Sequence, residues 1–116
     1  MKLTVELTRF KVKKDKTKRV DEWIKFLNEH MEEVLLTLDD EKMYVETIFR
    51  EDLHGEEFMY WYSVQGHGGQ EVTDSTHWID KKHLEFWKEC IDETFTPIDL
   101  TPEVIMIPEE IRSKML

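Results

Sequence analysis

The sequence predicts an α+β fold in which two helices pack on one face of an antiparallel sheet. Two segments carry apolar residues at helical spacing, and other segments alternate apolar and polar residues as strands do. These segments follow one another in the order β-α-β-β-α-β, which is the ferredoxin-like arrangement. A chain of 116 residues is close to the usual size of one domain. We therefore expect a single ferredoxin-like domain over residues 1–116.

The first half of the chain supplies two strands and a helix. Residues 3–12 alternate in polarity, and residues 42–50 do so again before a hairpin connection at 52–55. Between them, segment 18–38 places its apolar residues on one helical face. These residues are Val20, Ile24, Leu27, Met31, Val34, Leu35 and Leu38. We expect one uninterrupted helix here.

The second half supplies the remaining elements. Residues 56–66, EEFMYWYSVQG, form the third strand, and a glycine-containing loop follows it. Ser75 is the expected N-cap of a second helix that ends near Glu93. Prolines keep the next connection irregular, and residues 103–107 are the expected last strand. Pro108 suits the first turn of a terminal helix over residues 109–115.

The third strand carries large side chains on both of its faces, which is unusual for a half-buried strand. We assign the more apolar side of the central strands to the helices, namely Leu3, Val5, Leu7, Phe58, Tyr60 and Tyr62. The other side then holds Thr4, Glu6, Thr8, Phe10, Tyr44, Glu46, Ile48, Arg50, Met59, Trp61, Ser63 and Gln65. Two helices can cover one face only, so we expect a second copy of the chain to cover the other. The prediction is a homodimer joined through that sheet face.

Composition excludes several classes of function. A net charge of −10 opposes binding to nucleic acid and to anionic membrane surfaces. Cys90 is the only cysteine, which leaves no thiolate metal cluster, and its place on the apolar stripe of the second helix predicts a core residue. The five histidines lack the spacing of a zinc site, and we expect neither a metal nor another cofactor. No segment resembles a signal peptide or a membrane span, so a cytoplasmic location is expected.

Two resemblances support this fold. The order of elements, the aromatic third strand and the mixed second face resemble the dimeric α/β-barrel superfamily, in which two ferredoxin-like chains join their sheets. The segments VDEWIKFLNEHMEEVLLTL, KMYVETIFRE, YWYSVQG and WIDKKHLEFW resemble a small bacterial family of uncharacterised proteins. The superfamily includes cofactor-free monooxygenases, haem-degrading enzymes, isomerases, mutarotases and stress-induced proteins. The resemblance implies the fold and the dimer but selects no reaction.

Candidate functional residues cluster on the surfaces expected to face one another. His83 lies in the middle of the inward stripe of the second helix, where it could act as an acid or base. A pocket between helices and sheet would be lined by Trp23, His30, Tyr60, Tyr62, His83 and Trp87. His83 also suits a structural role, as a neutral core histidine bonded to a tyrosine hydroxyl. Glu6 and Glu46 share one sheet face, and structural pairing with Arg50 or across a dimer axis is favoured over acid–base work.

Two functions follow. The favoured one is a non-catalytic or stress-related dimeric protein whose aromatic rings are structural. The alternative is a cofactor-independent monooxygenase-like or isomerase-like enzyme that binds a small aromatic or carbonyl metabolite in this pocket, with His83 as the base.

Overall fold

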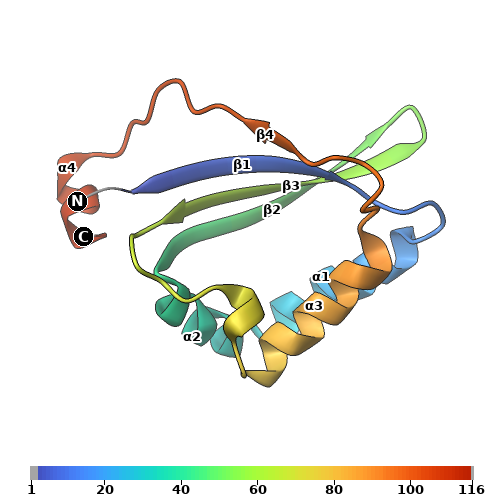
Figure 1. The fold of residues 1–116 in the computed structure, drawn as a ribbon, viewed down its shortest axis with the longest axis horizontal. Coiled ribbons are helices and arrows are strands. Elements are labelled where there is room, and N and C mark those ends of the chain that lie inside the picture. Colours follow the sequence, from blue (N-terminus) through green and yellow to red (C-terminus); the bar gives the residue numbers. More distant parts are fainter. Residues whose placement is uncertain (1–2, 116) are drawn as a thin grey trace.

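The computed structural model describes residues 3–115 and has two layers, a twisted antiparallel sheet and a layer of helices (Figure 1). The four strands lie in the order β2-β3-β1-β4. Their bounds are Thr4–Lys11 for β1, Met43–Leu53 for β2, Glu56–Gln65 for β3 and Ile98–Leu100 for β4. This is the strand order of the ferredoxin-like fold, with β1 and β3 in the centre. The predicted α+β class is confirmed.

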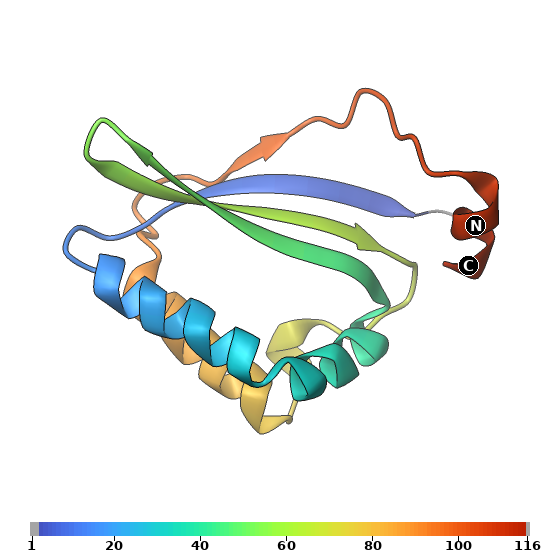
Figure 2. The same cartoon turned by 180° about the vertical axis from the view of Figure 1, so that it is seen from behind.

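The helices cover one face of this sheet (Figures 1 and 2). Their bounds are Thr17–Glu29 for α1, Met31–Glu41 for α2, Val72–Asp74 for the short 3-10 helix η1, Trp78–Cys90 for α3 and Glu109–Lys114 for α4. Helix α1 packs beside α3, and α2 contacts β2. Helix α4 lies away from this layer, close to the start of β1 (Figure 1). Within residues 3–115 no helix is both long and apolar enough to cross a membrane.

The expected helix 18–38 is divided into α1 and α2 at one residue. His30 has φ −113° and ψ 30°, which are not helical values. Its backbone N–H donates to the Phe26 carbonyl at 3.1 Å, and its Nδ1 lies 2.9 Å from the same oxygen. This local cap lets the chain change direction after α1, so that α2 continues beneath β2. The apolar periodicity runs through the break and did not reveal it.

The predicted last strand was wrong. Strand β4 is Ile98–Leu100, antiparallel to β1, whereas residues 103–107 have no regular structure. Pro102 cannot donate a backbone hydrogen bond, which disfavours extending β4. The second helix also begins later than expected, at Trp78, where His77 rather than Ser75 caps it by accepting from the Ile79 N–H at 3.2 Å. The terminal helix is confirmed as α4.

The assignment of the two sheet faces was also wrong. Met59 and Trp61 face the helices, together with Phe10 on β1 and Ile48 on β2. The opposite face, here called the outer face, carries Val5, Leu7, Val45, Phe49, Phe58, Tyr60, Tyr62, Ile98 and Leu100. The more polar set was expected to point outwards because of its Glu, Thr, Ser and Gln residues. It points inwards because those polar groups line a cavity.

The core lies beneath the end of the sheet where β1 enters α1. Met59, Val20 and Trp23 are fully buried there, and Phe86 and Cys90 complete the cluster. The prediction that Cys90 is a core residue is confirmed, and burial raises the pKa of its thiol, which makes it a poor nucleophile. At the other end the helices and the sheet diverge, and the cavity opens between them.

Candidate functional site

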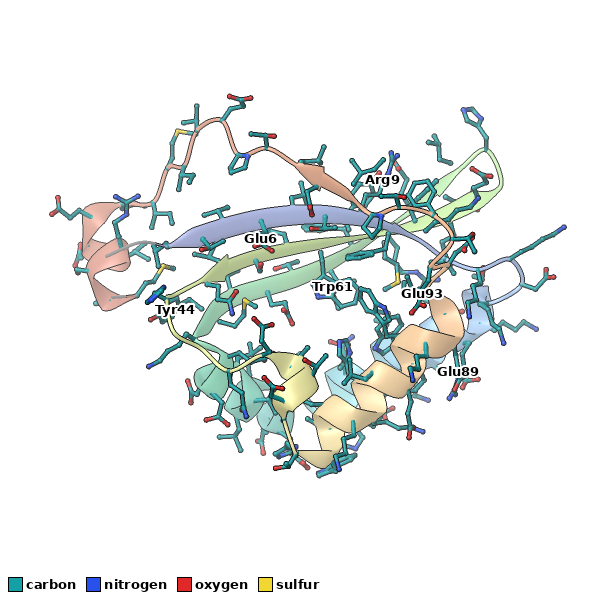
Figure 3. All side chains as sticks on the ribbon, viewed as in Figure 1. Glu6, Arg9, Tyr44, Trp61, Glu89 and Glu93 are labelled. Carbon is teal, nitrogen blue, oxygen red and sulfur yellow. The ribbon has the colours of Figure 1, made fainter. Side chains whose placement is uncertain are left out.

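A cavity of about 700 Å³ lies between the sheet and helices α1, α2 and α3. Its sheet wall is built from residues of the three longest strands that share one face, because side chains two residues apart point to the same side. Glu6 stands opposite Ser63 in the β1–β3 ladder, and Thr8 stands opposite Trp61. Figure 3 shows Trp61 on the helix side of the sheet and Arg9 on the other side. The volume is that of a small-molecule site.

The charged side chains that line this cavity all have the same sign. Five carboxyl groups contribute, from Glu6, Glu41, Glu46, Glu71 and Asp80. Among residues 3–115, no lysine or arginine lines the cavity. The nearby Arg50 is engaged elsewhere, with Nη1 2.6 Å from Asp21 and Nη2 2.7 Å from Glu57. The negative charge of the cavity is therefore not compensated by these residues, and the cavity disfavours anionic ligands.

Two of these carboxyl groups, those of Glu41 and Glu46, have raised pKa values. Burial raises the pKa of Glu41 to about 7, and repulsion from Glu46, Asp80 and other nearby carboxylates adds to the effect. Burial also raises the pKa of Glu46, and Asp80 adds to this, whereas the indole N–H of Trp61 acts in the opposite direction. The Glu46 side chain is nevertheless exposed to solvent, which the open cavity admits. Glu41 can therefore hold a proton at neutral pH beside the neighbouring Glu46 carboxyl group, as one group does in acid–base sites with two carboxyl groups.

His83 is the one histidine among the lining residues, and its partner is a tryptophan rather than a tyrosine. The Trp23 Nε1–H donates to His83 Nδ1 at 3.0 Å. Burial lowers the pKa of His83 to about 4, and the Asp80 carboxylate opposes this shift. The imidazole is consequently neutral at physiological pH. Its Nε2 has no hydrogen-bond partner within residues 3–115.

Aromatic rings form the floor of the cavity near His83. Trp61, Trp87 and Phe10 line it and pack on one another, with ring centroids 4.6 Å apart for Phe10–Trp87 and 5.2 Å apart for Trp61–Trp87. Such edge-to-face packing holds the rings rigidly. The cavity thus has an aromatic end beside His83 and an acidic end beside α2.

The loop after β3 forms the roof of the acidic end. Gln70 N–H donates to the Asp40 carbonyl at 2.8 Å, and Gly66 N–H donates to the Lys42 carbonyl at 2.7 Å. Gly69 lies directly against the backbone of Glu41, where any Cβ would collide with its carbonyl. The roof segment 70–73 lines the cavity and is held against the C-terminal turn of α2.

The structure brings together only part of the predicted set. His83 and Trp87 line the cavity, and Trp23 lies behind His83 as its hydrogen-bond donor. His30 is outside the cavity, with its ring against Phe26 at 4.6 Å. Tyr60 and Tyr62 are on the outer face, and the Tyr60 hydroxyl donates to Glu51 at 2.7 Å. Placing these last three residues in the pocket was wrong.

The residues that the sequence analysis missed are mainly carboxylates. Glu6 and Glu46 share a face as expected, but that face is the cavity wall and Arg50 pairs with neither. Asp80 had a usable signal, because it stands three residues before His83 and so shares its side of α3. Glu41 had none, since it follows the last apolar residue of the helical pattern. Among residues 3–115, no cluster of His, Cys, Asp and Glu could hold a metal ion.

Comparison with known proteins supports the fold and the family. No curated protein sequence is significantly similar to the chain. The structure is similar to that of L-rhamnose mutarotase from Formosa agariphila, with a TM-score of 0.52 and 16% identity. The match covers 90% of this chain and 98% of the mutarotase chain. A family of unknown function, DUF6176, matches residues 3–113. The chain therefore belongs to the DUF6176 family.

Proposed function

We propose that this protein binds a small, uncharged, hydroxyl-rich carbonyl compound, such as a free sugar, and catalyses its isomerisation by acid–base chemistry. The observation that carries the proposal is the cavity, which combines five carboxyl groups and a neutral imidazole and which no lysine or arginine of the described residues lines. Carboxylates accept hydrogen bonds from hydroxyl groups, and they repel phosphate and carboxylate groups. The aromatic floor offers flat surfaces for the C–H faces of a sugar ring.

Anomer interconversion is the reaction that suits these groups best. It needs a base to remove the proton from the anomeric hydroxyl and an acid to protonate the ring oxygen as the C–O bond opens. Rotation about the exposed C–C bond and the reverse proton transfers then close the ring in the other configuration. Glu41 can supply the acid at pH 7, because its pKa is raised to about 7, and the neighbouring Glu46 carboxyl group can supply the base. The likeness to L-rhamnose mutarotase supports this class of reaction.

The test is the rate of anomer exchange in reducing sugars, measured by NMR saturation transfer. We expect the protein to accelerate exchange for neutral sugars such as L-rhamnose, and to leave the corresponding sugar phosphates unaffected. Glu46→Gln should lower the rate by about 10²-fold or more, because a positioned acid or base typically contributes that factor. Glu32→Gln, an exposed position on α2, is the matched control and should keep full activity.

Two results would contradict the proposal. Equal acceleration of neutral and phosphorylated sugars would show that cavity charge does not select the ligand. Binding of neutral sugars without any acceleration would instead support the non-catalytic role. One observation favours the non-catalytic role. His83 is neutral and hydrogen-bonded to Trp23, so it can bind a ligand or stabilise the core without transferring a proton.

We also propose that the outer face joins two copies of the chain. Phe49, Ile98 and Leu100 are 53%, 38% and 47% exposed there, beside the half-buried Val5, Leu7 and Tyr62. Outside the end that carries Arg9, Lys11 and Glu51, this face is mostly apolar. A symmetric partner offers the same apolar surface and would cover it.

Sedimentation analysis tests the dimer. The wild-type protein should sediment as a dimer, and Tyr62→Glu should convert it to a folded monomer, because the charge would be buried unpaired at the interface. Leu36→Glu is the matched control, since Leu36 is 62% exposed on α2 and far from this face. A wild-type monomer at tens of micromolar, or a Tyr62→Glu dimer, would overturn the proposal.

A further inference from the structure

The contact between Trp23 and His83 determines which proton the imidazole carries. An indole nitrogen can donate a hydrogen bond but cannot accept one. Because Trp23 Nε1 lies 3.0 Å from His83 Nδ1, that Nδ1 must be the unprotonated, accepting nitrogen. In a neutral imidazole the single proton is then on Nε2. Trp23 is fully buried, with the ring of Phe86 stacked 6.1 Å away, so its indole is held in place.

The alternative protonation states are disfavoured by the same geometry. A proton on Nδ1 would face the Trp23 N–H directly and leave both donors without an acceptor, which is costly in a buried site. The doubly protonated imidazolium would meet the same conflict and would also lose its hydration. Asp80, one turn earlier on α3, is the carboxylate that favours the charged form, but burial outweighs it. The rings facing His83 from α1 and β3 are those of Trp23 and Trp61, which carry no charge.

We propose that Trp23 is a positioning residue that fixes His83 in its Nε2–H tautomer, so that His83 donates a hydrogen bond to an acceptor oxygen of the ligand. The acceptor would be a carbonyl or ring oxygen, and the proton acceptor of the reaction would be a carboxylate. This inference rests on the proposed function for its ligand, but the tautomer itself is a property of the free protein. It replaces the expectation that His83 is the base.

The donor role of His83 gives the two ends of the cavity different tasks in the proposed reaction. His83 stands at the aromatic end, where a donor can orient a ring without taking a proton from it. The carboxyl groups stand at the acidic end. Among residues 3–115, no lysine or arginine lines the cavity there to donate a hydrogen bond. An oxygen that gains negative charge as the ring opens would be stabilised by a donor already in place.

Nitrogen-15 NMR of the free protein tests the tautomer. Long-range proton–nitrogen correlations distinguish the two tautomers, and the His83 signals are assigned by their absence in His83→Gln. The wild type should show the Nε2–H form and remain neutral down to about pH 4. Trp23→Phe keeps a ring but removes the donor, and it should give a mixture of tautomers with a raised pKa. A wild-type His83 that is protonated on Nδ1, or that titrates near pH 6.5, would overturn the inference whether or not the protein has activity.

A second pair of variants tests the donor role and does not depend on Trp23→Phe being folded. The amide of His83→Gln can accept from Trp23 and still donate to a ligand, whereas His83→Leu can do neither. With L-rhamnose as the probe, we expect His83→Gln to keep its affinity and anomer-exchange rate within about 10-fold of wild type, and His83→Leu to lose more. Equal, large losses of rate in both variants would show that His83 transfers a proton and would contradict the inference. Absence of wild-type anomer exchange would count against the proposed function alone, and the tautomer result would still stand.

Discussion

Met59→Ala should lower the free energy of unfolding by about 2–5 kcal/mol, as large-to-small substitutions do in well-packed cores. Met59 has no exposed surface and contributes to the cluster formed by Val20, Trp23 and Phe86. Removing its side chain loses apolar burial and leaves a void between sheet and helices. Urea denaturation gives the change directly, and the loss should be the same at every protein concentration.

Phe49→Ala is the matched control for this substitution. Phe49 lies on β2 but on the outer face, with 53% of its surface exposed. In an isolated chain its loss should cost less than about 1 kcal/mol. In a dimer its cost should grow with protein concentration, because only the assembled state buries it. If Met59→Ala were as mild as Phe49→Ala, the orientation of the sheet described above would be incorrect.

The contribution of Glu41 to stability should fall as the pH rises from about 4.5 to 7, whereas the lowered pKa of His83 acts in the opposite direction between about pH 4 and 6.5. The pKa of Glu41 is raised to about 7 in the folded protein, whereas in the unfolded chain it is close to 4.5. Between these values the folded state binds the extra proton, so raising the pH favours unfolding. The contribution is fully present below pH 4.5 and is lost as the pH rises through about 7. Because Glu41 is partly solvated, we expect a loss of about 1–2 kcal/mol.

Glu41→Gln should remove this contribution, so that the stability of the variant relative to the wild type rises with pH, because the amide does not titrate and cannot repel Glu46 or Asp80. Urea denaturation at pH 5 and pH 7.5 measures the slope for each variant. The exposed Glu32, on the same helix, provides the control Glu32→Gln, which should keep the wild-type slope. An identical change in stability between pH 5 and pH 7.5 in the wild type and in Glu41→Gln would contradict the raised pKa.

The order of elements could be predicted from the sequence because apolar spacing reports local structure directly. The third strand, the terminal helix and the core position of Cys90 all follow from such patterns. The break at His30 could not be predicted, since it depends on one backbone conformation within an uninterrupted apolar stripe. The last strand was misplaced because β4 is only Ile98–Leu100, too short to show a pattern, while the more apolar segment after it makes no ladder.

The orientation of the sheet shows why the candidate site was only partly predicted. Burial rules count polar residues as outward-facing, and Glu6, Glu46 and Ser63 made the inner side of the sheet look like a surface. Those rules assume a filled interior. Where a cavity lies between two layers, polar side chains can face inwards, because solvent or a ligand in the cavity can hydrogen-bond to them. The more polar side of a strand can then be its inner side. His83 was identified because a helix stripe is defined by its own apolar neighbours and does not depend on that assumption.

The attachment of the roof to helix α2 has a consequence for access. Three successive carbonyls, those of Asp40, Glu41 and Lys42, accept hydrogen bonds from Gln70, Gln65 and Gly66. Any separation of this roof from α2 must either break those bonds or carry the last turn of α2 along with the loop. Glu41 belongs to that turn, so admitting a solute also brings water to its side chain and releases its proton more readily. Access beneath the roof and proton binding by Glu41 therefore both depend on the last turn of α2.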